Sequence, residues 1–384
     1  MKNVYCPVTH SYHSTNEVLD EIKTLVEFLE SNQTSNENIT FPRGTVTDDG
    51  RLDLCKQSIG IEGCEIISEA LKHNKTINAI LFGTDGIGNI GASKVAELIT
   101  ENETLETIYL GCNNIETEGV TALSESLEQN KSVKGLWLKR NPLGVEGAKR
   151  IAKMLRKNST LKVLDLVTTA IEKEGVDVIL EVLMTENRTL KKLYLSGNQI
   201  NEIQAEKLKE LLIENDSLET LMLSVNCLKD EGVIKIADGL KQNKTLQELS
   251  LASNGISLKG ANYLFETLSE NDSLKYLDLG YAISTRVLGA ERNEFGDVFA
   301  ETCRDFLKLN KPLQYLDLTK TGITNKGLQI IEEGILENSN LCKFKINAKL
   351  SETAKKHLQS NEQNSTIIFS KEVQAIKSVY RVVK

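Results

Sequence analysis

The sequence contains few of the residues from which catalytic and metal sites are usually built. Only four histidines occur among its 384 residues, and they are scattered along the chain. No combination of serine or cysteine with histidine and a carboxylate is therefore indicated, and no G-x-x-x-x-G-K-S/T phosphate-binding motif is found. We predict that the protein is not an enzyme and uses no cofactor and no metal ion.

Long apolar runs and an excess of positive charge are also missing. No stretch approaches the roughly 20 apolar residues of a transmembrane helix, and the first residues lack the apolar region of a signal peptide. The formal net charge is -8, whereas general binding to nucleic acids or membrane surfaces requires a basic face. We expect a cytoplasmic protein whose partner is not a nucleic acid, a membrane or a small-molecule substrate.

The cysteines do not form a disulfide pattern. Seven are present, an odd number without regular spacing. In a chain without a signal region, such cysteines are typical of reduced and mostly buried thiols.

What the sequence does contain is an eight-residue pattern, L-x-L-x-x-N-x-I/L, that returns at a nearly constant interval. Successive copies begin 28 residues apart, except for one interval of 29 and one of 39. Such a period over most of the chain indicates a repeat protein rather than several separate domains. The first positions of the copies are Leu52, Ile80, Ile108, Leu136, Leu164, Leu193, Leu221, Leu249, Leu277, Leu316 and Phe344.

Each repeat is predicted to contain one strand and one helix. Alternation across Leu193, Tyr194 and Leu195 indicates a short strand with two side chains directed inward and one outward. The asparagine that follows, Asn198 in this copy, offers a buried amide for the backbone groups of a bend. After the bend, apolar residues recur at helical spacing. Because one such unit cannot bury its apolar face alone, neighbouring repeats must stack.

The pattern resembles the ribonuclease-inhibitor type of leucine-rich repeat. The resemblance covers about residues 52–350 and includes the helix segment x-E-G-x-x-x-L-x-x-x-L, as at Glu118 and Gly119. It implies an α/β leucine-rich repeat solenoid, a horseshoe with a parallel β-sheet on the concave side and helices on the convex side. In its short, regular repeats, rich in Asn, Lys and Glu, the chain also resembles the leucine-rich effectors of intracellular bacteria, and this resemblance implies a site of action in the host cytosol.

We expect three regions along the chain. Residues 1–50 form an N-terminal helical cap, in which the polar segments 31–40 and 42–50 are loops. Residues 51–350 carry about eleven repeats, with an insertion around 281–298 that is either a contact loop or a tolerated surface insertion. Residues 351–384 form a C-terminal cap and tail.

The outward strand positions supply the candidate binding residues. Their central part is apolar and aromatic, and we expect the small residues beside it, such as Gly83 and Gly111, to leave the larger side chains free for a partner. Alternatively, rings on adjacent strands pack on one another and only stabilise the sheet. The candidates are Tyr109, Trp137, Lys139, Arg140, Asp165, Tyr194, Met222, Tyr276 and Tyr315.

These features predict a protein-interaction module that binds another protein in its concave face, as an inhibitor or effector. Two alternatives remain. The repeat type also resembles the activating protein of the Ran GTPase, although the C-terminus here is basic where that family is acidic. The repeats are also compatible with the substrate-recognition arm of a ubiquitin-ligase adaptor.

Overall fold

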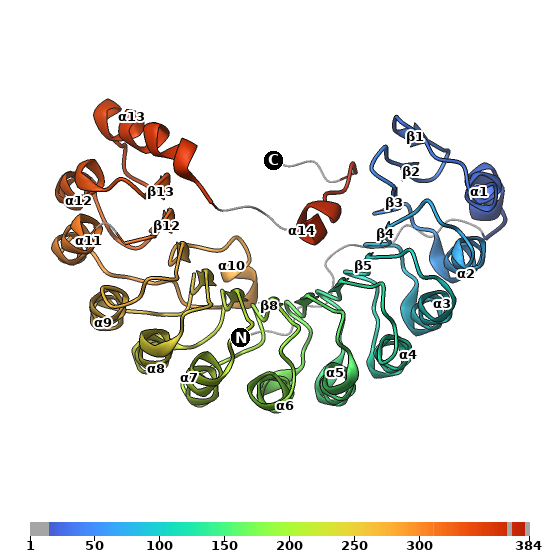
Figure 1. The fold of residues 1–384 in the computed structure, drawn as a ribbon, viewed down its shortest axis with the longest axis horizontal. Coiled ribbons are helices and arrows are strands. Elements are labelled where there is room, and N and C mark those ends of the chain that lie inside the picture. The colour runs from blue at the N-terminus through green and yellow to red at the C-terminus, as the bar shows by residue number, and fades with distance from the viewer. Residues whose placement is uncertain (1–14, 310, 367–370, 381–384) are drawn as a thin grey trace. The chain divides into compact units, whose positions relative to one another are not determined.

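The computed structural model describes residues 15–309, 311–366 and 371–380, which divide into two compact units. The N-terminal unit contains the described residues 15–182 and 371–380, and the C-terminal unit contains the described residues from 183 to 366. Strands alternate with helices in both units, so the predicted α/β repeat architecture is confirmed (Figure 1).

The N-terminal unit begins with a helix and a β-hairpin and then repeats strand and helix. The C-terminal segment of the chain also belongs to this unit and adds one more short helix. The elements are α1 (Thr15–Glu30), β1 (Ile39–Thr40), β2 (Thr45–Val46), β3 (Arg51–Asp53), α2 (Gly60–Leu71), β4 (Ala79–Leu81), α3 (Gly88–Glu101), β5 (Thr107–Tyr109), α4 (Thr117–Leu127), β6 (Gly135–Trp137), α5 (Gly144–Lys157), β7 (Val163–Asp165), α6 (Glu172–Thr185), which crosses the unit boundary, and α14 (Lys371–Ala375).

The C-terminal unit continues the same alternation and contains one additional short helix, α10. Its elements are β8 (Lys192–Tyr194), α7 (Gln204–Glu214), β9 (Thr220–Met222), α8 (Lys229–Gln242), β10 (Glu248–Ser250), α9 (Leu258–Leu268), β11 (Tyr276–Asp278), α10 (Thr285–Leu288), α11 (Phe299–Lys308), β12 (Tyr315–Asp317), α12 (Asn325–Glu337), β13 (Lys343–Lys345), α13 (Glu352–Asn361) and the 3₁₀ helix η1 (Glu362–Asn364).

The strands of neighbouring repeats pair in parallel and in register within each unit. Leu52 pairs with Ile80 in the N-terminal unit, and Leu221 pairs with Leu249 in the C-terminal unit. These residues are fully buried against the helices. The residue after each of them points to the opposite side of the sheet, because side chains alternate along a strand. We call that opposite side the inner face.

The N-terminal end of the sheet contains strands where the sequence suggested loops. β1 and β2 form an antiparallel hairpin, and β2 pairs antiparallel with β3 through Val46 and Leu52. The loop prediction for 31–50 is therefore wrong at these residues. The hairpin covers the edge of the first repeat strand, a position at which unpaired backbone groups invite aggregation. Helix α1 buries Ile22 and Leu25 beside α2.

One series of asparagines connects the repeats where each strand ends. Asn141 is fully buried, and its Nδ2 donates to the carbonyl oxygens of Leu110 and Leu138, both at 2.9 Å. Its Oδ1 accepts from the backbone N–H of Asn113 at 2.8 Å and of Ile115 at 3.1 Å. One amide thus satisfies two donors and two acceptors that belong to adjacent repeats, which explains why this position is polar inside the core.

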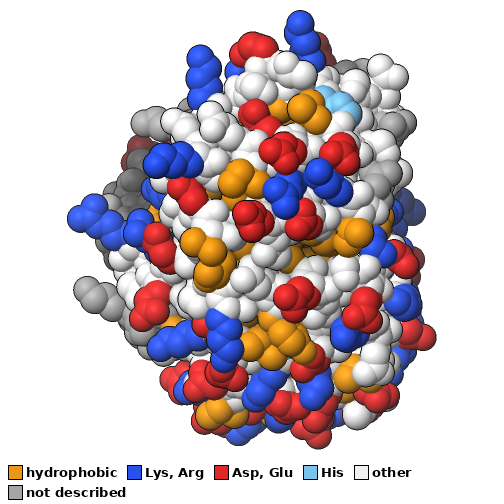
Figure 2. Space-filling view, turned by 90° about the vertical axis from the view of Figure 1, so that its left-hand side faces the viewer, with side chains coloured by type: hydrophobic (Ala, Val, Ile, Leu, Met, Phe, Trp, Pro, Cys, Tyr) orange, Lys and Arg blue, Asp and Glu red, His pale blue; other side chains and the backbone are white. Residues whose placement is uncertain are grey.

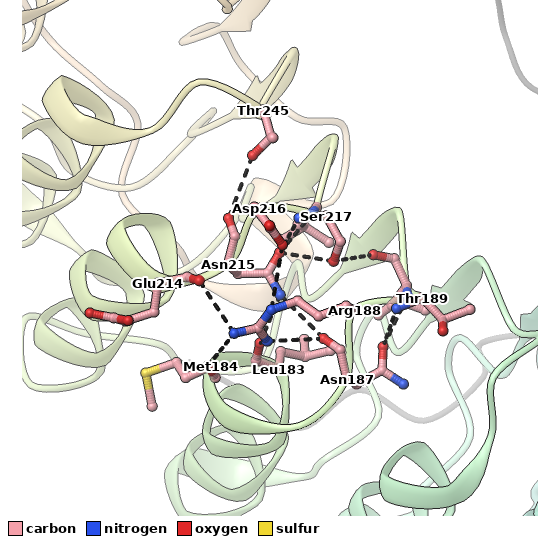
Figure 3. A network of polar contacts seen from close by, with 12 residues as sticks. Leu183, Met184, Asn187, Arg188, Thr189, Glu214, Asn215, Asp216, Ser217 and Thr245 are labelled. Carbon is pink, nitrogen blue, oxygen red and sulfur yellow. Dashed lines mark hydrogen bonds and ion pairs between the residues drawn. The ribbon is translucent and has the colours of Figure 1, made fainter.

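A second series of asparagines connects the repeats where each helix ends. Asn215 Nδ2 donates to Leu183 O at 2.7 Å, while its Oδ1 accepts from the N–H groups of Ser217 and Leu218. Arg188 adds hydrogen bonds to the carbonyl oxygens of Leu183 and Met184, and its guanidinium lies 3.4 Å from the carboxylate of Asp216 (Figure 3). Other members of this buried series are Asn74, Asn102, Asn158, Asn187 and Asn243, each of which begins an N-x-S/T triplet.

The insertion in the ninth repeat leaves the asparagine series intact. Asn293 donates to Leu251 O at 3.0 Å and Leu279 O at 2.8 Å, and it accepts from the N–H groups of Asn254 and Ile256, each at 3.0 Å. These are the contacts that Asn141 makes in its own repeat. The eleven additional residues therefore lie between β11 and Asn293, and the repeat pattern resumes at Asn293.

The helix side of the C-terminal unit carries mixed charge. On the side that bears α11 and α12, basic and acidic side chains alternate, and hydrophobic side chains form only small separate groups (Figure 2). Lys308 on α11, for example, lies 2.9 Å from the carboxylate of Glu337 on α12. Such a surface is typical of a solvated helix face, and we place no binding site there. None of the helices in the described part of the chain is long and apolar enough to cross a membrane.

Candidate functional site

Two of the predicted anchor residues on the inner face of the N-terminal unit are buried. Tyr109 is 3 % exposed and Trp137 is 2 % exposed. The expectation that both side chains stand free is therefore wrong. The glycines beside Tyr109 explain its burial, because a Cβ at Gly83 would lie 2.3 Å from Tyr109 Cε1 and one at Gly111 would lie 2.7 Å from Tyr109 Oη. The Tyr109 ring therefore occupies the space that these glycines leave.

Replacing Gly83 with alanine should displace the Tyr109 ring and destabilise the N-terminal unit. The added Cβ would also lie 3.1 Å from Cys55 Sγ, so little room remains for adjustment. Overpacking of this kind costs about 1–3 kcal/mol. Denaturant unfolding of Gly83→Ala measures the loss. In a Tyr109→Ala background the same replacement should cost much less, and an equal cost in both backgrounds would exclude this packing role.

The charged candidates of the N-terminal unit occupy different environments. Lys139 is half-buried, with Nζ 5.4 Å from the centre of the Tyr109 ring, whereas Arg140 is exposed. Asp165 is 5 % exposed and accepts a hydrogen bond of 2.9 Å from the N–H of Val167. Of these three residues, only Arg140 presents an open side chain.

Tyr194 and Met222 lie side by side on the inner face of the C-terminal unit. They are register partners on β8 and β9, and both are half-buried. Each therefore keeps part of its apolar surface available, unlike Tyr109 and Trp137.

Tyr276 and Tyr315 form a stacked pair on β11 and β12. Their ring centres are 4.1 Å apart and the ring planes differ by 11°. Burial raises the pKa of both hydroxyl groups. Tyr276 is half-buried, whereas Tyr315 is 9 % exposed and donates to Asp317 Oδ2 at 3.2 Å. The pair thus presents mainly the outer surface of Tyr276.

A carboxylate beside this pair is held by the sheet. Asp278 accepts from Ser250 Oγ at 2.8 Å and from the N–H of Gly280 at 3.0 Å. Burial is the largest cause of its pKa shift and raises the pKa of the carboxyl group above its ordinary value. On β13, Lys345 is exposed and lies 3.6 Å from Asp317 Oδ2. Rings, acceptors and a cation therefore lie close together, as in the polar rim of a protein interface.

The insertion displays two apolar side chains that the sequence analysis did not select. Ile283 is 97 % exposed and Val287 is 58 % exposed. Phe295, which also lies within 281–298, is instead 4 % exposed and packs against Phe299 with ring centres 5.0 Å apart. The sequence did contain a signal for this difference. Ile283 and Val287 occupy no position of the repeat pattern, whereas Asn293 and Phe295 occupy its asparagine position and its last apolar position.

The base of this insertion is fixed to the neighbouring repeats. Thr285 is buried and donates to Ser253 Oγ at 2.7 Å, and the N–H of Gly255 donates to Glu291 O at 3.1 Å. Tyr281 is half-buried, and Lys320 Nζ lies 4.0 Å from the centre of its ring. The insertion therefore holds its exposed side chains on an ordered support.

The geometry of the described residues offers contacts for recognition and no assembled catalytic set. The Nε2 atom of His357 lies 2.7 Å from Asn338 O, a contact to the backbone of the helix-end series. No group of three or more His, Cys, Asp or Glu side chains in the described part of the chain is placed to hold a metal ion.

Comparison with known proteins identifies the repeat. The family described as "Leucine Rich repeat" matches residues 101–124, 157–180, 186–202, 214–237, 242–265 and 309–331. No curated protein matches the sequence.

Several solved structures are similar at low identity. Leiomodin-1 actin-binding site 2 is 18% identical with a TM-score of 0.32, and the alignment covers 44% of this chain and 92% of that one. The tropomodulin C-terminal domain from Caenorhabditis elegans is 14% identical with a TM-score of 0.29, covering 49% and 91%. The yeast Rad7 and Elc1 complex gives 13% identity and a TM-score of 0.40, covering 82% and 85%.

Sequence period, local structure and family matches agree. Each repeat provides a strand and a helix, and the matched segments fall in phase with that alternation. Repeats of this kind support a role as a protein-interaction module. The chain is a leucine-rich repeat protein.

Proposed function

We propose that this protein binds a partner protein without catalysing a reaction, and that the C-terminal unit provides the contact surface. The surface consists of the inserted segment 281–292 and the half-buried inner-face residues that precede it on the strands. Its apolar members are Ile283, Val287, Tyr194, Met222 and Tyr276.

The observation that carries the proposal is the exposure of Ile283 on an ordered support. An isoleucine that is 97 % exposed contributes nothing to folding through burial. The insertion nevertheless holds it in place through the buried Thr285 and through Leu288, which is 3 % exposed. Apolar anchors on a preorganised support lose little conformational entropy on binding, which favours affinity.

The inner face beside the insertion supplies the polar part of the surface. Tyr276 and Tyr281 present amphipathic rings, and the carboxylate of Asp278 is already held by Ser250 and Gly280. Interfaces combine apolar anchors with a rim of hydrogen-bonding groups in this way. The surface therefore suits a protein partner better than a small molecule.

Replacing both Ile283 and Val287 with serine should abolish partner capture. Both side chains are largely exposed, so the change is expected to alter stability by no more than about 0.5 kcal/mol. Immobilised wild type and variant would be incubated with a lysate of the source cells, and retained proteins would be identified by mass spectrometry. The expected result is a protein that wild type retains at least tenfold more than the variant.

Ile203→Ser is the matched control. Ile203 is 64 % exposed in the same unit but lies immediately before helix α7, away from the inner face. The control should retain the partner, and circular dichroism melting should be the same for all three proteins. If the double variant and wild type retain the same proteins in equal amounts, the insertion is not the contact surface.

A further inference from the structure

The C-terminal segment of the chain contacts the first strands of the N-terminal unit. Helix α14 ends at Ala375, and residues 377–380 then lie beside β2 and β3. This contact joins residues more than 320 positions apart in the sequence. No repeat consensus predicts it.

Asp53 on β3 makes the central contact. This aspartate occupies the outward strand position, is 1 % exposed, and accepts from the N–H of Cys55 at 3.0 Å. Asp165 and Asp278 make the same local bond to the residue two positions on. Asp53 differs because its Oδ2 also accepts from the N–H of Val379 at 2.6 Å, and its Oδ1 accepts from Ser378 Oγ at 3.1 Å.

Two further contacts flank Asp53. The Arg51 guanidinium donates to Lys377 O, and the hydroxyl groups of Thr45 and Tyr380 are 2.7 Å apart. Burial, with a smaller contribution from the charge of Asp53, raises the pKa of Tyr380. The side chains of Thr45, Arg51 and Asp53 thus form hydrogen bonds with four consecutive residues of the segment. The segment contributes the carbonyl oxygen of Lys377, the hydroxyl of Ser378, the N–H of Val379 and the phenol of Tyr380.

The part of the segment whose side chains the structure describes has no buried apolar anchor. Val379 is 48 % exposed, and none of the residues 373–380, whose side chains are described, is buried. Such hydrogen bonds largely replace bonds to water, whereas ordering a chain segment loses conformational entropy. The contact is therefore specific, but it is weak enough for the segment to leave the site and be replaced by another peptide.

We infer that Thr45, Arg51 and Asp53 form a binding site for a short linear peptide of a partner protein, and that the C-terminal segment is its exchangeable intramolecular occupant. The peptide presents a hydroxyl residue, a residue with a free backbone N–H, and a tyrosine, as in Ser378, Val379 and Tyr380. The segment lowers the apparent affinity for such a peptide, because only the fraction of open sites can bind. This site lies in the other unit and is independent of the surface proposed above.

The test uses the full chain with Val379→Pro and a fluorescein-labelled peptide of residues 371–384. Proline removes the N–H that binds Asp53, so the intramolecular segment is released while the site remains intact. The labelled peptide should bind this variant at least tenfold more tightly than it binds wild type, measured by fluorescence anisotropy. Val379→Ala is the matched control, since it removes the side chain but keeps the N–H, and its affinity should stay close to that of wild type.

Two further measurements decide the assignment. Trypsin should cleave the Lys377–Ser378 bond at least fivefold faster in Val379→Pro than in Val379→Ala, and addition of Arg51→Ala to the proline variant should weaken peptide binding. Equal peptide affinity for the proline and alanine variants would overturn the inference, as would equal binding of a labelled peptide that itself carries the proline. A wild-type dimer in sedimentation that Val379→Pro dissociates would assign the segment to a second copy instead and overturn the intramolecular assignment.

Discussion

Replacing Asn293 with alanine is expected to destabilise the C-terminal unit by about 3–5 kcal/mol, because each buried polar group that loses its partner costs about 1–3 kcal/mol and water can restore only part of the loss. The variant would leave the carbonyl oxygens of Leu251 and Leu279 and the N–H groups of Asn254 and Ile256 without this amide. Urea unfolding followed by circular dichroism, with hydrogen exchange to locate the change, measures the effect.

Arg292→Ala provides the control for this experiment. Arg292 immediately precedes Asn293, is exposed, and forms a surface ion pair of 2.6 Å with Glu294. Exposed pairs contribute about 0–1 kcal/mol, so this variant should unfold nearly as wild type does. If the two substitutions lower the free energy of unfolding by similar amounts, Asn293 is not the repeat asparagine, and the insertion does not end at this residue.

Replacing Asp85 with asparagine is expected to stabilise the N-terminal unit at neutral pH by about 1–3 kcal/mol, the usual cost of an unsatisfied buried polar group. Asp85 occupies the asparagine position of its repeat and is 1 % exposed. Its Oδ1 accepts from the N–H groups of Gln57 and Ser58, but its Oδ2 has no hydrogen-bond partner among the described residues. An amide would instead donate towards Leu54 O and Phe82 O, as Asn113 donates to Phe82 O and Leu110 O.

The same site should make stability depend on pH. Burial raises the pKa of Asp85 well above its ordinary value of 3.8, despite the opposing backbone hydrogen bonds. The folded state therefore holds this proton more tightly than the unfolded state, and the associated stability is fully present below the unfolded pKa and is lost as pH rises through the folded pKa. Asp85→Asn should remove this decrease from the pH profile of the free energy of unfolding.

Asp48→Asn serves as the control, since Asp48 is exposed and lies outside the asparagine series. That variant should keep the wild-type pH profile. Two results would contradict this prediction: a lower free energy of unfolding for Asp85→Asn than for wild type at pH 7, or a free energy of unfolding that still decreases with rising pH in this variant. Either result would show that the fold accommodates the carboxyl group in a way that the amide cannot reproduce.

The repeat architecture could be predicted from the sequence because it depends on the spacing of apolar residues along the chain. A strand and a helix must recur when apolar residues return every 28 positions, and adjacent repeats then pair in register, as Leu221 does with Leu249. The two asparagine series follow from the same period, because each amide serves backbone groups at a constant separation. The sequence also marks the end of the insertion, because Asn293 is the asparagine of the repeat pattern. The mark is harder to see there, since the last position of that pattern is Phe295 instead of Ile or Leu.

The accessibility of the inner face required the assembled structure. Alternation correctly directs Tyr109 away from the helices. The glycines at 83 and 111 nevertheless leave room for its ring beside the neighbouring strand, so the residue is buried. Periodicity gives the direction of a side chain but not the space that neighbouring strands leave above it.

The same reasoning separates the other surfaces. Ile283 and Val287 became candidates only once Thr285 and Leu288 proved to be the buried side chains of the insertion. The contact of Val379 with Asp53 joins segments at opposite ends of the chain. Repeat period governs interactions between neighbours, whereas contacts made by insertions and terminal segments depend on the three-dimensional placement of residues that share no phase, and only folding brings them together.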